Sequence, residues 1–256
     1  MTFERGGGNG SILLLGVDDT DDLDGPGTGR RARDLAAELA SAGLAVPLGV
    51  TRHQLLVSPE IPYTSHNSSA CLTLLADLGL RDEIREAAES FLVAGCAAVA
   101  DVGLCLAGLE QAKEVVAAWG RRAKREVLTQ DEAHEVARAA GVELRGLTGT
   151  RGGVIGALAA VGLRARGGDG RFLWLAGLRE ATGSMTVGDL IRTAGIDEVR
   201  GPDGAKLPDR ELVDTGEWLR PLLLDGKAIL PVEEAGDGTA HGWRVLPRDR
   251  IKALSS

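Results

Sequence analysis

Short apolar runs alternate with helical patterns along the first 175 residues of the chain. The run at 12–17 is apolar throughout and stops abruptly at a group of aspartates, which is typical of a strand buried on both faces. Over 27–42, leucine and alanine recur at spacings of four residues, which predicts a helix that Gly43 ends. Similar patterns predict further strands within 44–57, 70–75 and 99–106, and further helices over 82–93 and 109–119.

A basic stretch at 121–125 separates this region from a second one, and it is either a solvated linker or a grip on a polyanionic ligand. Thr129 and Glu132 form a capping-box pattern for a helix that would run to Ala140 and end at Gly141. Strand patterns at 142–147 and 171–175 flank a glycine-rich turn and a helix over 154–161. From about residue 186 onward, prolines punctuate short β-like runs. The sequence therefore predicts a mixed α/β (α+β) chain in three parts, 1–120, 121–185 and a small β-rich segment over 186–256.

Composition narrows the class of protein. Hydrophobic residues make up 44% of the 256 positions, enough for a globular chain with a sizeable core. A net charge of −8 and an aromatic content of 3% offer no global attraction to nucleic acid and little material for base stacking. The three cysteines form no Cys-x-x-Cys pair, which argues against a zinc ribbon or a disulfide framework. Without a signal sequence or a membrane-length apolar run, we expect a cytoplasmic protein with no membrane partner.

The stretch 18–28 carries the clearest candidate chemistry. Four carboxylates lie within 18–22, directly after the first strand, where ligands of open α/β sheets bind. Clustered carboxylates repel each other unless a cation lies among them, and Mg²⁺ commonly takes one or two carboxylates plus substrate phosphates. Gly25 and Gly27 would let the backbone approach a phosphate, and Thr28 would lie at a helix N-terminus. The simpler alternative is an acidic N-cap in a solvated loop.

Known motifs of similar composition fit this stretch poorly. A Walker loop needs Gly-Lys-Ser/Thr, which is absent here. An EF-hand loop that began at Asp19 would place Leu23 at a ligand position and Arg30 where a bidentate glutamate belongs. A phosphatase of the Asp-x-Asp-x-Thr type would need a threonine at Leu23.

Two later stretches are candidates for the same site. The loop at 61–69 offers His66 and Asn67 to a phosphate or substrate, although its prolines also fit a stiff turn. The turn Arg151-Gly152-Gly153 opens a helix, so it fits either anion binding or a tight turn that needs glycine. Arg52 and His53 are weaker candidates, and we interpret His53 as structural.

These three stretches together resemble the archaeal tRNA-isoleucine agmatidine synthetases. Gly-Val-Asp-Asp-Thr-Asp at 16–21, followed by Gly-Pro-Gly-Thr at 25–28, resembles the opening motif of that family. Ile-Pro-Tyr-Thr at 61–64 with Asn67 resembles its second motif, and Arg-Gly-Gly-Val-Ile-Gly-Ala-Leu-Ala-Ala at 151–160 resembles its third. Three ordered matches at compatible separations are far more specific than one, and they span roughly 16–175.

The resemblance implies an ATP-using, kinase-like α/β domain over 1–120 and a ferredoxin-like α/β domain over 121–185, with ATP bound between them. It implies that Asp18, Asp19 and Asp21 hold Mg²⁺ and phosphate. It gives Asp19 and Thr28 catalytic roles, with Thr28 as a phospho-acceptor or phosphate ligand. The implied ATP- and phosphate-binding residues are Gly25, Gly27, Thr28, Asn67, Arg151, Gly152 and Gly153.

The chain also departs from the family pattern. The family's Cys-Thr-Thr is Gly-Thr-Gly at 27–29, and its Lys-Thr-Arg is Thr-Ser-His at 64–66, which removes two cations. Nothing after residue 186 resembles the family's OB-fold or its cysteine-rich zinc ribbon. We therefore predict an ATP/Mg²⁺-dependent phosphotransfer or ligase-type enzyme that acts on an unidentified small substrate, with tRNA disfavoured as a partner. The alternatives are a tRNA-modifying ligase like the agmatidine synthetases and a non-catalytic nucleotide-binding regulatory module.

Overall fold

The computed structural model describes residues 10–20, 27–61, 67–236 and 242–255, and an antiparallel sheet forms the centre of its N-terminal lobe. Strand β1 (Ser11–Asp18) lies between β3 (Ser68–Ala76) and β4 (Gly103–Gly108). Strand β2 (Val46–Gln54) pairs with β3, and β5 (Glu143–Gly146) pairs with β4. All these neighbours are antiparallel, so the rule for ligand sites in parallel sheets does not explain why the acidic stretch lies at the carboxyl end of β1.

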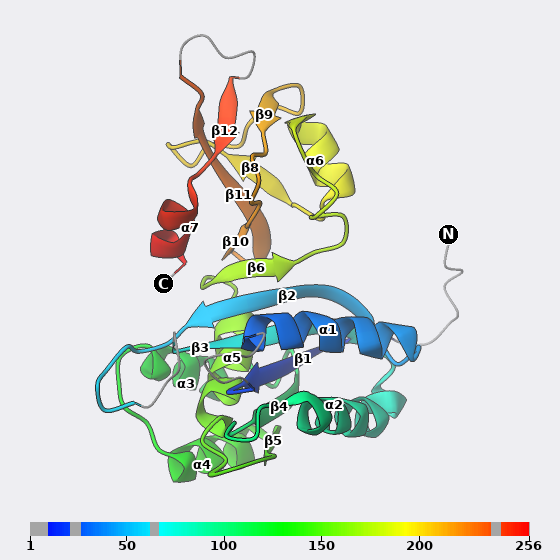
Figure 1. Ribbon diagram of the computed structural model, residues 1–256, viewed down its shortest axis with the longest axis vertical. Coiled ribbons are helices and arrows are strands. Elements are labelled where there is room, and N and C mark those ends of the chain that lie inside the picture. The colour runs from blue at the N-terminus through cyan, green and yellow to red at the C-terminus, as the bar shows by residue number, and fades with distance from the viewer. Residues whose placement is uncertain (1–9, 21–26, 62–66, 237–241, 256) are drawn as a thin grey trace.

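The order of elements gives the lobe its topology (Figure 1). Helix α1 (Thr28–Ser41) connects β1 to β2, and α2 (Arg81–Gly95) connects β3, through the short 3₁₀ turn η1 (Leu78–Leu80), to β4. Strand β3 lies between β1 and β2, which is the split β-α-β arrangement of ferredoxin-like sheets. The resemblance implied a ferredoxin-like unit over 121–185, whereas this arrangement lies in the part of the chain before residue 109. The division of the chain at residue 121 remains a prediction.

Helices cover both faces of this sheet. Helices α1 and α2 pack on one face, where Leu13 and Leu15 are fully buried. Helices α3 (Val115–Ala123), α4 (Gln130–Ala140) and α5 (Val154–Arg166) pack on the other face around Leu14 and Trp119. Because β1 is covered on both sides, its apolar run has no polar alternation. Helix α3 begins later than predicted, since Gly108 N donates to Gln111 Oε1 at 2.8 Å and 109–114 form turns.

The capping box predicted for α4 is confirmed. The Thr129 side chain accepts from Glu132 N, the Glu132 side chain accepts from Thr129 N, and Gly141 ends the helix with a φ of 65°. Of the three cysteines, all unpaired, Cys71 and Cys105 are buried as small apolar residues.

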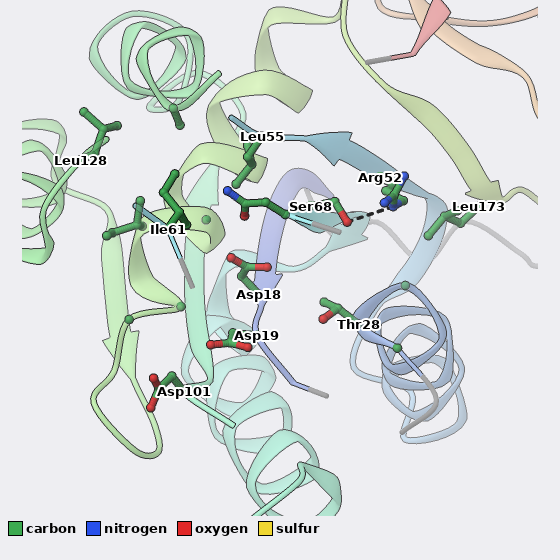
Figure 2. Close-up of a pocket in the computed structure, with 18 of the residues that line it drawn as sticks. Asp18, Asp19, Thr28, Arg52, Leu55, Ile61, Ser68, Asp101, Leu128 and Leu173 are labelled. Carbon is green, nitrogen blue, oxygen red and sulfur yellow. Dashed lines mark hydrogen bonds between the residues drawn. The ribbon is translucent and has the colours of Figure 1, made fainter. Parts of the chain in front are cut away.

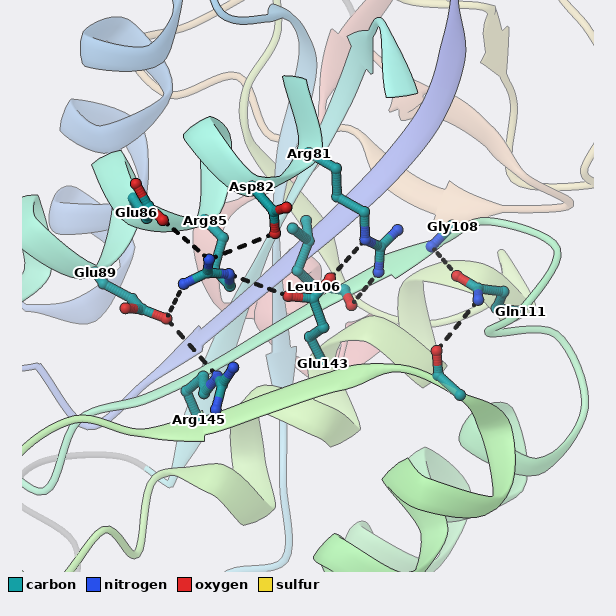
Figure 3. Close-up of polar contacts among 11 residues, drawn as sticks. Arg81, Asp82, Arg85, Glu86, Glu89, Leu106, Gly108, Gln111, Glu143 and Arg145 are labelled. Carbon is teal, nitrogen blue, oxygen red and sulfur yellow. Dashed lines mark hydrogen bonds and ion pairs between the residues drawn. The ribbon is translucent and has the colours of Figure 1, made fainter. Parts of the chain in front are cut away.

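Edge strand β5 is fastened to the rest of the lobe by charged side chains from α2 (Figure 3). Arg81 Nε lies 2.6 Å from Glu143 Oε1, and Arg85 Nε lies 3.2 Å from Glu143 Oε2. Arg81 also donates through Nη2 to Leu106 O at 3.0 Å, next to the strand pairing of β4 and β5. Residues from the second predicted unit therefore complete the sheet of the first.

Glycines let α5 lie close against the sheet. A Cβ on Gly16 would lie 2.1 Å from Ala157 O, and one on Gly103 would lie 2.0 Å from Gly153 C. Any larger residue at either position would push α5 away from β1 and β4. The close approach places the first turn of α5 beside the end of β1.

A β-rich lobe follows, as the sequence predicts for the end of the chain. Strand β6 (Arg171–Trp174) pairs with both β2 and β10, so it links the two lobes. The remaining elements are β7 (Ser184–Thr186), α6 (Val187–Thr193), β8 (Glu198–Arg200), β9 (Leu212–Asp214), β10 (Leu222–Leu224), β11 (Lys227–Glu234), β12 (Trp243–Val245) and α7 (Arg248–Leu254). This lobe has its own core, which includes Leu190, Leu223 and Leu230. Across the described ranges, no helix has the length and apolar character needed to cross a membrane.

Candidate functional site

A pocket of about 570 Å³ opens at the carboxyl end of β1, between the starts of α1 and α5 (Figure 2). It brings together residues from all three stretches that the sequence singles out. The predicted site residues that line it are Asp18, Asp19, Gly27, Thr28, Asn67, Gly152 and Gly153. Asp21 and Gly25 lie outside the described residues, and Arg151 is not among the lining residues.

The carboxylate of Asp18 lies against the first turn of α5. A Cβ on Gly156 would lie only 1.8 Å from Asp18 Oδ2, so the glycine leaves the space that the carboxylate occupies. The first turn of α5 has no acidic residue of its own. Because the N-terminus of a helix carries partial positive charge, it stabilises the ionised form of Asp18.

Asp19 follows with a left-handed backbone, at a φ of 54°. Aspartate adopts this conformation more readily than most residues. The turn directs the chain away from β1, and Figure 2 shows the Asp18 and Asp19 side chains together in the pocket.

The start of α1 forms a second wall of the pocket. Gly27 precedes the helix with a φ of 75°, a conformation that favours glycine. Thr28 is 8% exposed, and its Oγ1 accepts hydrogen bonds from Thr20 N at 3.4 Å and Thr20 Oγ1 at 3.3 Å. The helix has neither a side-chain cap nor an acidic residue in its first turn. Its N-terminus is therefore suited to an anion in the pocket.

Asp101 also lines the pocket, and the sequence analysis missed it. Its Oδ1 accepts from Thr150 N at 2.5 Å and its Oδ2 accepts from Thr150 Oγ1 at 2.6 Å, while its carbonyl accepts from Gly153 N at 2.8 Å. These bonds hold the glycine turn before α5 against the start of β4. The available signal was an acidic residue directly before an apolar strand, at a position equivalent to the end of β1 in the antiparallel pair.

The other two predicted motifs differ in their relation to the pocket. Asn67 lines it and closes the base of its own loop, because Asn67 Nδ2 donates to Leu56 O at 2.7 Å and Leu55 N donates to Asn67 O at 2.9 Å. Arg151 packs beside Gly146, whose added Cβ would lie 2.3 Å from Arg151 Cβ. His66 lies outside the described residues.

Four arginines line the same pocket, and of these the sequence analysis proposed only Arg52. The other three are Arg30, Arg33 and Arg220. Arg52 Nε donates to Ser68 Oγ at 3.0 Å, and burial lowers the pKa of its guanidinium. Arg220 comes from the β-rich lobe, far along the chain, so no local pattern could assign it to this pocket.

His53 has the structural role that we expect from the sequence. It is fully buried, with Nδ1 3.0 Å from Asp169 Oδ1 and Nε2 2.9 Å from Thr51 Oγ1. Asp169 also pairs with Lys124, from the basic stretch that follows α3. This group joins the two lobes behind the pocket and is not part of its lining.

The donors present fit a magnesium ion that is shared with a phosphate. Within the described ranges, no group of three or more His, Cys, Asp or Glu side chains could hold a metal by itself. Mg²⁺ does not require such a group, because it keeps several waters and binds through one or two carboxylates plus substrate phosphates. Asp18 and Asp19 supply two carboxylates of this kind beside the start of α1.

Comparisons with known proteins agree with the resemblance found in the sequence. The chain is 34% identical over 157 residues to the tRNA-isoleucine 2-agmatinylcytidine synthetase TiaS of Pyrococcus horikoshii, a match that covers 59% of this chain and 35% of that protein. The fold is similar to the TiaS–tRNA–ATP complex (TM-score 0.52, 24% identity, 59% of this chain and 36% of that one). It is also similar to apo TiaS (TM-score 0.50, 24% identity, 59% and 35%). No family model matches the chain.

The chain resembles the archaeal tRNA-isoleucine agmatidine synthetases, but it spans only about a third of the length of the relatives it matches. The prediction that tRNA is disfavoured as a partner is wrong, because this relative is a tRNA synthetase and has been solved in complex with tRNA and ATP. The physical error was to use a net charge of −8, since the charge of a whole chain does not describe the arginines gathered at one pocket.

Proposed function

We propose that this chain is an ATP-dependent ligase-type enzyme that modifies a tRNA base. The observation that carries the proposal is the pocket itself, which joins the two aspartates after β1 to the uncapped start of α1 and the glycine turn before α5. Its likeness to an agmatinylcytidine synthetase supports tRNA as the acceptor and agmatine as the first small co-substrate to test. We place the enzyme in the cytoplasm.

Each residue then has a stated role toward ATP. Asp18 and Asp19 would hold Mg²⁺, which when bound neutralises phosphate charge during transfer. The backbone of Gly27 and the start of α1 would bind phosphate oxygens, and Gly152 and Gly153 would form the facing wall. Thr28 would position a phosphate or accept it, and as an acceptor it would need a base to remove its proton. Asp19 lines the same pocket and is our candidate for that base.

The test is ATP consumption by the purified chain with Mg²⁺, agmatine and tRNA. We expect consumption to depend on tRNA and to fall roughly 100-fold or more in Asp19→Asn and Thr28→Ala, because both remove groups aimed at the phosphates. Asp82→Asn is the matched control, since Asp82 is 80% exposed on α2 and pairs only with Arg85 among its printed neighbours. Equal consumption in all four proteins would refute the mechanism.

A non-catalytic nucleotide-binding module is the second candidate function. The glycines at 27 and 29 favour it, since they replace residues of the family's Cys-Thr-Thr motif. It predicts that ATP raises the melting temperature of the chain while no combination of tRNA and amine produces turnover. Turnover that depends on tRNA would exclude it.

A further inference from the structure

Four arginines gather where the two lobes meet, and we call them the arginine cluster. They are Arg52 on β2, Arg171 on β6, Arg220 before β10 and Arg248 at the start of α7. Arg52 and Arg171 lie directly opposite each other in the pairing of β2 with β6. On its other side, Arg171 lies opposite Leu222, two residues beyond Arg220.

The cluster is positive charge without a carboxylate counterpart. None of the ion pairs found across the described ranges includes any of its four members. Burial lowers the pKa of Arg171 to about 10, and the charges of Arg52, Arg220 and Arg248 lower it further in the same direction. Like charges placed opposite each other across two strands destabilise a sheet. The fold therefore carries a cost that a bound anion would remove.

Arg171 shows that the cluster is a built site. It is only 6% exposed, and its Nη1 donates to Ser255 Oγ at 2.8 Å. Its Nε is buried and has no hydrogen-bond partner in the structure. A buried donor without a partner costs about 1–3 kcal/mol. Surface arginines that happen to lie close together would not show this unsatisfied buried group.

Trp218 holds the two outer members of the cluster in place. The guanidinium of Arg220 lies 4.8 Å from the centre of the Trp218 ring, and that of Arg248 lies 5.6 Å from it. The indole in turn packs against Leu222, Leu246 and Ile251. A stacked guanidinium keeps its N–H groups at its edge, where they match the oxygens of a phosphate.

The position of the cluster indicates a polymeric ligand. Arg52 and Arg220 line the pocket that holds Asp18 and Asp19, and Figure 2 shows Arg52 on a different side of it from Asp101. Arg171 and Arg248 lie outside the pocket lining, and Arg248 is exposed on the surface. A ligand that reaches both ends must enter the pocket and continue along the surface, as a polynucleotide does and a mononucleotide at the aspartates does not.

We infer that the arginine cluster binds a backbone phosphate of the polynucleotide whose base enters the pocket. The inference rests on the proposed function, because it takes the substrate to be tRNA and leaves the ATP phosphates to the aspartate end. Charge-assisted hydrogen bonds from planar guanidinium groups are the usual means of holding a phosphodiester. The cluster thus gives an acidic chain a local grip on RNA.

The test measures binding of unmodified tRNA and, separately, of ATP by the full chain. We expect Arg220→Gln and Arg248→Gln each to weaken tRNA binding roughly tenfold and to reduce the slope of log K against log salt by about 1. ATP affinity should stay within twofold. Arg210→Gln is the matched control, because Arg210 is 88% exposed and lies in the same lobe away from the cluster. Arg248 is exposed, so its variant tests the inference even if changes at Arg171 unfold the chain.

The outcomes separate this inference from the proposed function. If the wild type binds tRNA and consumes ATP but both variants bind tRNA like Arg210→Gln, the cluster has no role and the function stands. If the variants lose ATP and keep tRNA, the cluster serves a nucleotide phosphate and the inference is overturned. If the folded wild type retains no tRNA at low salt, the proposed function fails, and the polynucleotide ligand of the cluster fails with it.

Discussion

Gly156→Ala offers a direct test of whether the position of Asp18 matters. The added Cβ would lie 1.8 Å from Asp18 Oδ2 and 2.5 Å from its Cγ, both side-chain atoms. An ordinary contact between these atoms needs about 3.5 Å, so the carboxylate oxygen must move by roughly 1.5 Å. A misplacement of about 1 Å in a reacting site can cost roughly 100-fold in rate.

The same change should leave the fold almost intact. Alanine is favoured over glycine inside a helix by about 1 kcal/mol, which offsets part of the cost of moving the Asp18 side chain. We therefore expect tRNA-dependent ATP consumption to fall roughly 100-fold while the melting temperature changes by less than about 3 °C. Both quantities are measured on one preparation, by an ATP assay and by thermal unfolding.

Two other glycines supply the controls. Gly168→Ala meets no atom within 4 Å and should behave like the wild type. Gly162→Ala places a Cβ 1.9 Å from the backbone oxygen of Val116, so it should destabilise the chain by about 1–3 kcal/mol. The reasoning is refuted if Gly156→Ala keeps full activity. It is also refuted if this variant melts as early as Gly162→Ala, since the backbone would then have absorbed the clash.

Two further predictions concern stability. Thr129→Ala removes the capping box of α4 and should cost about 1 kcal/mol, seen as a fall of about 2–4 °C in melting temperature. Burial lowers the pKa of His53, so the folded chain keeps a neutral imidazole while the unfolded chain takes up a proton near pH 6.5. The contribution of His53 is therefore fully present above pH 6.5 and is lost as the pH falls below it, a slope that urea unfolding at several pH values should show and His53→Gln should reduce.

Each stability prediction has a control. Glu135→Ala, on the exposed face of α4, should shift the melting temperature far less than Thr129→Ala, and equal shifts would mean that the cap contributes nothing. A wild-type slope that matches His53→Gln across pH 5–7 would show that the buried imidazole is protonated in the folded chain.

The local patterns determined much of the fold. The apolar run of β1, the four-residue spacings of α1 and the Thr129–Glu132 box each depend on neighbours within one or two turns, so the sequence alone locates them. The mixed α/β class follows from these elements. The resemblance also came from the sequence, because three ordered motifs need no knowledge of how the chain folds.

Only the tertiary structure decided which distant residues share the pocket. Asp101 reaches it through the pairing of β4 with β1, and Arg220 reaches it because β6 joins the β-rich lobe to β2. Arg151 stands beside two glycines of the pocket wall but is not itself part of the lining. The net charge likewise concealed the arginine cluster, because charge sums over the chain while a phosphate responds to the few groups nearest to it. Sequence thus specified the elements and the acidic turn after β1, and the packing of two lobes decided what faces that turn.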